Sequence, residues 1–170
     1  MVTNGGFGFA LNVAKEINQS RGQIPLFKSA MKYLGKNIYS LFLVKQFLKN
    51  KVNDVSIEVV CDEYRDRITV PLLLINNQPS LAGSFLVAPK THNDDGKFNI
   101  TIFKHQSKRK LLKAIYNLSQ GLFPKNDNEL VQLETTKVKI KGLEAGKKLA
   151  FFGDGEIFDE SEEFEFEICK

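Results

Sequence analysis

Apolar and polar residues alternate along much of the chain after residue 53, and this period of two predicts β-strands. The alternation is clearest at residues 55–59, 98–102, 131–133 and 138–140. Residues 68–75 are apolar almost throughout, which predicts one continuous and more deeply buried strand. Near the C-terminus, residues 163–168 alternate glutamate with Phe or Ile, so the apolar side chains should face the core and the glutamates solvent.

A helical period replaces this alternation in three places. Residues 9–19 carry an amphipathic pattern that breaks at residues 20–22, and residues 26–48 carry a second one that Gly35 interrupts. Ser107 precedes a third helix, which Gly121 should end. The whole pattern predicts a mainly β protein with helices (α+β): a helical pair over residues 9–50, then a β-sandwich over residues 53–170 with one inserted helix.

The length of 170 residues fits a single domain, residues 1–170, and 42% hydrophobic with 26% charged residues excludes a disordered, collagen-like or coiled-coil chain. No apolar run is long enough for a membrane span, and no secretory signal pattern is visible. Cys61 and Cys169 match no metal or redox spacing, so we predict two reduced core thiols and a cytoplasmic location. Residues 1–9 begin at once with glycine and apolar residues, which suggests a piece of a larger protein.

The net charge of +4 combines two opposed segments. Eight of the 20 acids and one of the 24 bases fall from Asp154 onward, so this segment has −7, and the other 23 bases and 12 acids give +11. Lysines concentrate in residues 104–113 and 137–148 without interleaved exposed aromatics, which argues against nucleic-acid binding. These stretches are either solvated faces or a peripheral contact with an anionic membrane surface.

The strongest candidate for chemistry is Gly153-Asp154-Gly155-Glu156, which follows the apolar residues 149–152. Two glycines allow a sharp turn that presents both carboxylates at one strand end, where they could deprotonate a hydroxyl or hold a cation. The alternative is an acidic hairpin turn, because Asp-Gly is a common two-residue hairpin signal.

A second candidate is the polar loop of residues 89–97, which contains His92, Asp95 and Lys97. Carboxylate and backbone carbonyl oxygens in such a loop can bind a hard cation, and the alternative is an ordinary solvated connection. The two histidines, His92 and His105, have no cysteine near them, so a zinc site is not expected. Gly5-Gly6-Phe7-Gly8 lacks the lysine of a phosphate-binding loop and indicates close backbone packing at an entry strand.

The order of these pieces resembles the C-terminal domain of the diacylglycerol kinase catalytic family, which includes bacterial lipid kinases, sphingosine kinases and ceramide kinases. The resemblance covers essentially the whole chain. It rests, in order, on the glycine-rich start, a Tyr-Leu-Gly-Lys-Asn-Ile-Tyr helix at residues 33–39, Asn76-Asn77, Gly83, Ala88-Pro89, residues 95–98 and Asp154-Gly155-Glu156.

The resemblance implies a two-domain enzyme that transfers the γ-phosphate of ATP to a lipid hydroxyl, with Mg²⁺. This chain would be the β-sandwich half that completes the lipid site. Glu156 would be the proton acceptor for the attacking hydroxyl, and Asp154 would be its partner at the cleft. Asp95 would be a ligand of a structural magnesium ion, together with the backbone carbonyls of His92 and Lys97.

The sequence departs from this family in one respect, because the Gly-Gly-Asp-Gly-Thr segment of its nucleotide-binding N-terminal domain is absent. We therefore expect the isolated chain to be inactive, with ATP bound by an N-terminal partner domain. Two alternatives stay open from the residues: a non-catalytic sandwich that binds lipid or a partner, and a cation-dependent hydrolase that uses Asp154 and Glu156. The lipid itself could be diacylglycerol, a sphingoid base, ceramide or a prenol.

Overall fold

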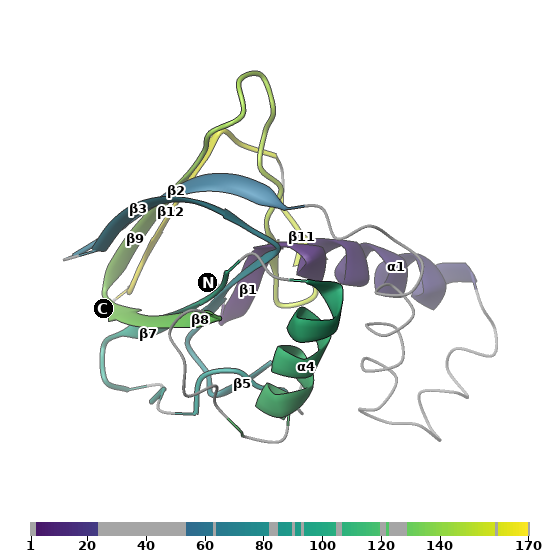
Figure 1. The fold of residues 1–170 in the computed structure, drawn as a ribbon, viewed down its shortest axis with the longest axis horizontal. Coiled ribbons are helices and arrows are strands. Elements are labelled where there is room, and N and C mark those ends of the chain that lie inside the picture. The colour runs from purple at the N-terminus through teal and green to yellow at the C-terminus, as the bar shows by residue number, and fades with distance from the viewer. Residues whose placement is uncertain are drawn as a thin grey trace.

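The computed structural model describes residues 3–23, 54–62, 64–81, 85–89, 91–92, 94–104, 107–119, 122, 129–158 and 160–169. Within them lie two helices and twelve strands (Figure 1). The helices are α1 (Phe9–Gln23) and α4 (Lys108–Ser119). The strands are β1 (Asn4–Gly8), β2 (Val55–Cys61), β3 (Tyr64–Val70), β4 (Leu72–Asn76), β5 (Ser80–Leu81), β6 (Phe85–Leu86), β7 (Phe98–Phe103), β8 (Leu130–Thr135), β9 (Lys137–Gly142), β10 (Phe152–Gly153), β11 (Glu156–Ile157) and β12 (Glu163–Glu167). The predicted helix over residues 26–48 falls outside the described residues.

Two antiparallel sheets form the predicted sandwich. One has six strands in the order β11-β10-β1-β4-β7-β8, and the other has four in the order β12-β9-β2-β3. Fourteen buried residues form the core between them, including Phe7, Ile57, Ile100, Ile140 and Phe151. The prediction of a mainly β sandwich with helices is therefore confirmed.

The outer face of the six-stranded sheet is covered by α1 and α4 (Figure 1). A second core forms there from Phe9, Leu72, Phe103, Leu111 and Phe152, among others. Because both faces of this sheet are covered, every residue of β4 and β7 is buried. None of the described helices is long and apolar enough to cross a membrane.

The glycines of β1 allow the backbones of the neighbouring strands β4 and β10 to lie very close to β1. A Cβ on Gly6 would lie 2.3 Å from the carbonyl oxygen of Leu73, and one on Gly5 would lie 2.4 Å from that of Phe152. Gly8, at φ +82°, ends the strand where Phe9 begins α1. The expectation of close backbone packing at an entry strand is confirmed.

Three local predictions are wrong. Residues 68–75 do not form one strand, because Pro71 separates β3 of the four-stranded sheet from β4 of the six-stranded sheet. Proline has no N–H for a sheet ladder, so the chain changes sheets at that point. Helix α1 continues through the predicted break at residues 20–22, since one internal glycine costs a helix only about 1 kcal/mol. Both cysteines are free, but only Cys61 is in the core, and Cys169 is exposed.

The outward face of the four-stranded sheet is a network of ion pairs. Strand β12 pairs with β9, and Lys137 Nζ lies 2.7 Å from Glu165 Oε1 and 3.5 Å from Glu167 Oε2. Lys139 Nζ lies 2.7 Å from Glu163 Oε1. The glutamates of β12 point outward as predicted, but they are paired with lysines of the neighbouring strand.

Candidate functional site

The Gly153-Asp154-Gly155-Glu156 segment is a tight hairpin between β10 and β11. Gly153 pairs with Glu156, which leaves Asp154 and Gly155 as the two turn residues. Both have positive φ, +49° and +89°. This is the geometry that makes Asp-Gly a preferred two-residue hairpin turn. The local hairpin interpretation is therefore correct, and the question becomes what the carboxylates do.

The Asp154 carboxylate is hydrogen-bonded to the start of β1. Its Oδ2 accepts a hydrogen bond from Thr3 N–H (2.8 Å), and its Oδ1 accepts from Thr3 Oγ1 (2.5 Å) and from Asn4 N–H (3.0 Å). Burial raises the pKa of this carboxyl, but the hydrogen bonds from Thr3 and Asn4 outweigh burial and hold the pKa below its usual value. Asp154 is therefore an ionised acceptor with three donors, a role suited to holding structure.

The backbone of the same turn is fixed from two further sides. The Asp154 N–H donates to the Asn4 carbonyl at 2.8 Å, and Asn18 Nδ2 of α1 donates to the Gly155 carbonyl at 2.9 Å. These two hydrogen bonds join residues 150 and 137 positions apart in sequence. The hairpin is held by β1 and by the middle of α1, and Glu156 follows it directly.

Glu156 lies on β11, the edge strand of the six-stranded sheet, and is exposed. Its carboxylate forms no hydrogen bond or ion pair with any described residue. A carboxylate on a rigid turn, open to solvent and without a competing donor, can accept a proton from a hydroxyl brought to it. The two acidic residues of the motif therefore differ: the Asp154 carboxylate accepts three hydrogen bonds from the protein, whereas the Glu156 carboxylate is open to a substrate.

A row of buried polar residues extends from the hairpin across the same end of the sheet, and the sequence analysis did not identify it as a unit. Asn4 pairs with Asn76 across β1 and β4, and Asn76 pairs with Asn99 across β4 and β7. Asn76 Nδ2 donates to Asn4 Oδ1 at 3.0 Å, and Asn99 Nδ2 donates to Thr91 Oγ1 at 2.7 Å. Their one shared signal is an asparagine at or next to the end of a buried strand.

Two acceptors at this end of the sheet have no donor within the described part of the chain, Asn76 Oδ1 and Asn77 Oδ1. Buried polar atoms normally have a partner, since each one left unsatisfied costs about 1–3 kcal/mol. This end of the sheet can therefore accept hydrogen bonds from water or from a hydroxyl.

The predicted cation loop lies at the same end of the sheet, just before β7. Asp95 Oδ1 accepts a hydrogen bond from Lys97 N–H at 2.9 Å, and Gly96 turns the chain at φ +71°. Three strand spacings separate β10 from β7, about 14 Å, so Asp95 and Asp154 belong to separate sites.

His92, Asp95 and Lys97 are all exposed, and the described residues contain no cluster of three metal-ligating side chains. One carboxylate with nearby carbonyls fits a magnesium ion that keeps most of its water, as Mg²⁺ commonly does. The loop could hold such an ion through Asp95 and the carbonyls of His92 and Lys97.

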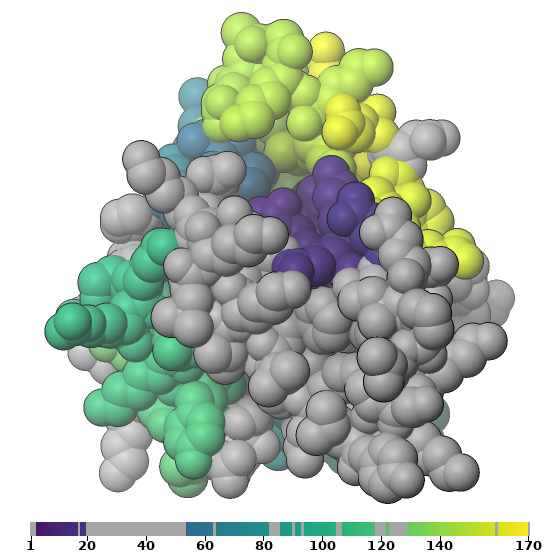
Figure 2. Space-filling model, turned by 90° about the vertical axis from the view of Figure 1, so that its right-hand side faces the viewer, coloured from purple at the N-terminus to yellow at the C-terminus, as the bar shows by residue number. Residues whose placement is uncertain are grey.

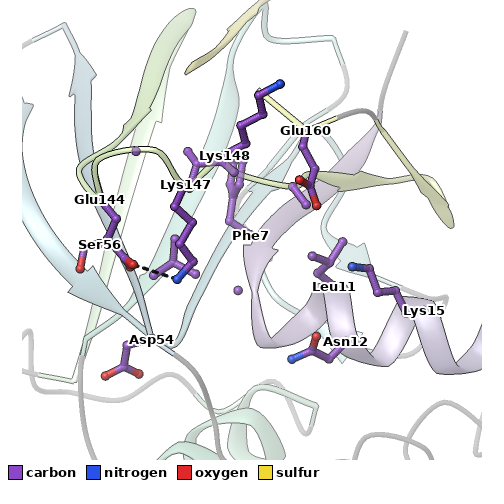
Figure 3. A pocket seen from close by; sticks show the side chains of 15 residues that line it. Phe7, Leu11, Asn12, Lys15, Asp54, Ser56, Glu144, Lys147, Lys148 and Glu160 are labelled. Atoms are coloured by element: carbon purple, nitrogen blue, oxygen red, sulfur yellow. Dashed lines mark hydrogen bonds and ion pairs between the residues drawn. The ribbon is translucent and has the colours of Figure 1, made fainter. Parts of the chain in front are cut away.

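A separate cleft of about 210 Å³ lies between α1 and the loop of residues 143–148 (Figures 2 and 3). Its apolar lining includes Phe7, Leu11 and Leu149, and its rim carries three lysines and three acids. Lys147 Nζ is bonded to Glu144 Oε2 at 2.9 Å, as the dashed line in Figure 3 shows. The cleft contains neither Asp154 nor Glu156, and its rim has no excess of one charge.

Comparison with known proteins gives a consistent picture. The family model of the YegS C-terminal NAD kinase beta sandwich-like domain matches residues 13–163. A crystal structure of a candidate diacylglycerol kinase from Bacillus anthracis str. Sterne superposes with a TM-score of 0.62 at 16% identity, covering 98% of this chain and 50% of that one. The structure of a diacylglycerol kinase from the same organism gives 0.59 at 10% identity, covering 97% and 45%. No curated protein matches the sequence.

The solved structures share the fold at these identities, and the chain spans about half of their length.

Proposed function

The chain belongs to the YegS C-terminal NAD kinase beta sandwich-like family, and from that premise we propose that it is the lipid-substrate half of an ATP-dependent lipid kinase. In this function the γ-phosphate of ATP is transferred to the hydroxyl of a diacylglycerol or sphingoid-like lipid. ATP is bound by a nucleotide-binding domain that this chain complements. The proposal is supported by the family match and by the names of the structural neighbours.

The observation that carries the proposal is the state of Glu156, an exposed carboxylate directly after a turn that β1 and α1 both hold. Phosphoryl transfer requires positioning and charge neutralisation, with a carboxylate to orient the attacking hydroxyl and accept its proton. We assign that role to Glu156.

Asp154 has a different role in this proposal. Its carboxylate accepts three hydrogen bonds from Thr3 and Asn4, so it has little remaining capacity to act on a substrate. We assign it as a positioning residue that sets the direction of the hairpin. Asp95 and the carbonyls of His92 and Lys97 would hold a structural Mg²⁺, and the magnesium bound with ATP would neutralise charge on the phosphates.

The test is Glu156→Gln in the two-domain protein, in which this chain is joined to its nucleotide-binding domain. Glu162→Gln serves as the matched control, because Glu162 is also exposed and the substitution removes the same charge. We expect Glu156→Gln to abolish transfer from radiolabelled ATP to lipid with an unchanged melting temperature, and Glu162→Gln to leave activity intact. Normal turnover in Glu156→Gln would remove Glu156 from this role.

A lipid panel of diacylglycerol, sphingosine, ceramide and a prenol, assayed with the same protein, identifies the acceptor. The chain by itself should show no transfer to any of the four, since the proposed nucleotide site belongs to the other domain. Lipid phosphorylation by the chain alone would contradict the division of the active site.

A further inference from the structure

Helix α4 presents a basic face to solvent. Its sequence contains four bases and no acid, and no acidic residue occurs anywhere in residues 104–126. Leu111, Ala114 and Ile115 are buried against the six-stranded sheet. Arg109, Lys113 and Tyr116 follow one another at spacings of four and three, which places them together on the opposite side of the helix.

The two most exposed large apolar side chains among the described residues lie on this face and just beyond the C-terminal end of α4. Tyr116 is 63% exposed, and Leu122, just beyond the helix, is 59% exposed. The Leu122 N–H donates to the Asn117 carbonyl at 2.9 Å, which fixes Leu122 relative to α4. An amphipathic ring and an aliphatic side chain beside several bases are typical of a surface that meets lipid headgroups.

In the other lysine-rich stretch, residues 137–148, three of the five lysines form ion pairs, Lys137 and Lys139 with glutamates of β12 and Lys147 with Glu144. The hydrogen bonds that Lys137 and Lys139 donate to Glu165 and Glu163 raise the pKa of each lysine. By contrast, Arg109, Lys110 and Lys113 form no ion pair with any described residue. The structure therefore distinguishes two stretches that look equivalent in the sequence.

We propose that the outward face of α4, with Arg109, Lys110, Lys113, Tyr116 and Leu122, docks the protein on an anionic membrane surface. The bases bind headgroup phosphates, while Tyr116 and Leu122 enter the headgroup layer. Figure 2 shows α4 (green) along one flank of the molecule, where a flat partner can reach it. This surface shares no residue with the Glu156 hairpin, so the docking proposal and the kinase proposal can be tested independently.

The test is co-sedimentation of the chain with vesicles of phosphatidylcholine, alone and mixed with phosphatidylglycerol. We expect binding only to the anionic vesicles and loss of binding at high salt, where the Debye length falls to about 3 Å. Each surface base contributes roughly fivefold to membrane partitioning, so Arg109→Gln/Lys113→Gln should bind about 30-fold more weakly.

The matched control is Lys141→Gln/Lys148→Gln, which removes the same charge from exposed lysines elsewhere. It should change binding by no more than a few-fold. Arg109→Lys/Lys113→Arg keeps both charges and should bind as tightly as the unmodified chain. This result would show that the loss in Arg109→Gln/Lys113→Gln comes from charge and not from misfolding. A third variant, Tyr116→Ser/Leu122→Ser, should weaken binding at constant charge.

Three results would overturn the proposal: no binding to anionic vesicles, equal binding to phosphatidylcholine alone, or an equal fall in both charge-removal pairs. Binding of single-stranded RNA through α4 without vesicle binding would also overturn it, because the partner would then be a nucleic acid.

Discussion

Replacing Asp154 with alanine should destabilise the fold by about 3 kcal/mol, although the residue lies on an exposed turn. The carboxylate accepts three hydrogen bonds, and removing it leaves the Asn4 N–H without its acceptor and exchanges two Thr3 bonds for water. We assign about 2 kcal/mol to this loss, near the value for one charge-assisted bond, because solvent reaches the Thr3 donors. Alanine at a φ of +49° adds about 1 kcal/mol of backbone strain.

The measurement is urea unfolding followed by far-ultraviolet circular dichroism, since the chain has no tryptophan for fluorescence. For a chain of this length, the expected loss corresponds to a fall of roughly 6–12 °C in the melting temperature. Asp154→Asn separates the two contributions, because asparagine tolerates positive φ and keeps one acceptor oxygen. It should cost about 1 kcal/mol.

Glu156→Gln is the comparison that tests the reasoning. Glu156 is two residues away and carries the same charge, but its side chain contacts no hydrogen-bond or ion-pair partner among the described residues. The unfolding free energy of Glu156→Gln should therefore differ from that of the unmodified chain by no more than about 0.5 kcal/mol. A loss below about 1 kcal/mol in Asp154→Ala, or an equal loss in Glu156→Gln, would refute the division between a positioning and an available carboxylate.

Two further measurements test the packing and the charges. Gly6→Ala should destabilise the fold by about 3 kcal/mol or more in the same urea assay, because its Cβ would lie 2.3 Å from the Leu73 carbonyl oxygen. Gly146→Ala, at φ +72° with open space around it, should cost only about 1 kcal/mol, and similar losses in both would contradict the close-approach argument. Acid should also weaken the fold, because three carboxyl groups have a pKa below the usual value. Hydrogen bonds from Arg65 and Arg67 lower the pKa of Glu58, and the hydrogen bond from Lys137 lowers the pKa of Glu165. Hydrogen bonds from Thr3 and Asn4 lower the pKa of Asp154. The stability that such groups contribute is complete above their pKa in the unfolded state, about 4, and is lost as the pH falls through their lower pKa in the folded state. An unfolding free energy that stays constant from about pH 5 down to pH 2 would contradict these pairings.

The charge asymmetry of the chain illustrates how far sequence reasoning reaches. The alternation in residues 163–168 correctly placed Phe164 and Phe166 inward and the glutamates outward. It could not place β9 beside β12, because strand pairing depends on the global topology. That pairing decides that Lys137 and Lys139 are neutralised, whereas Arg109, Lys110 and Lys113 of α4 form no ion pair with any described residue.

The sequence alone determined what depends on neighbouring residues: the strand period, the burial of alternate side chains, the close-packed glycines of β1 and the Asp-Gly turn. These follow from steric and hydrophobic preferences that act within a few residues. Only the tertiary structure decided that Pro71 divides one apolar run between two sheets, and that Asp154 is bonded to Thr3 and Asn4. Those features join segments far apart in the chain, and the Asp154 contacts exist because β10 pairs with β1 in the six-stranded sheet, which places residue 154 beside the start of β1.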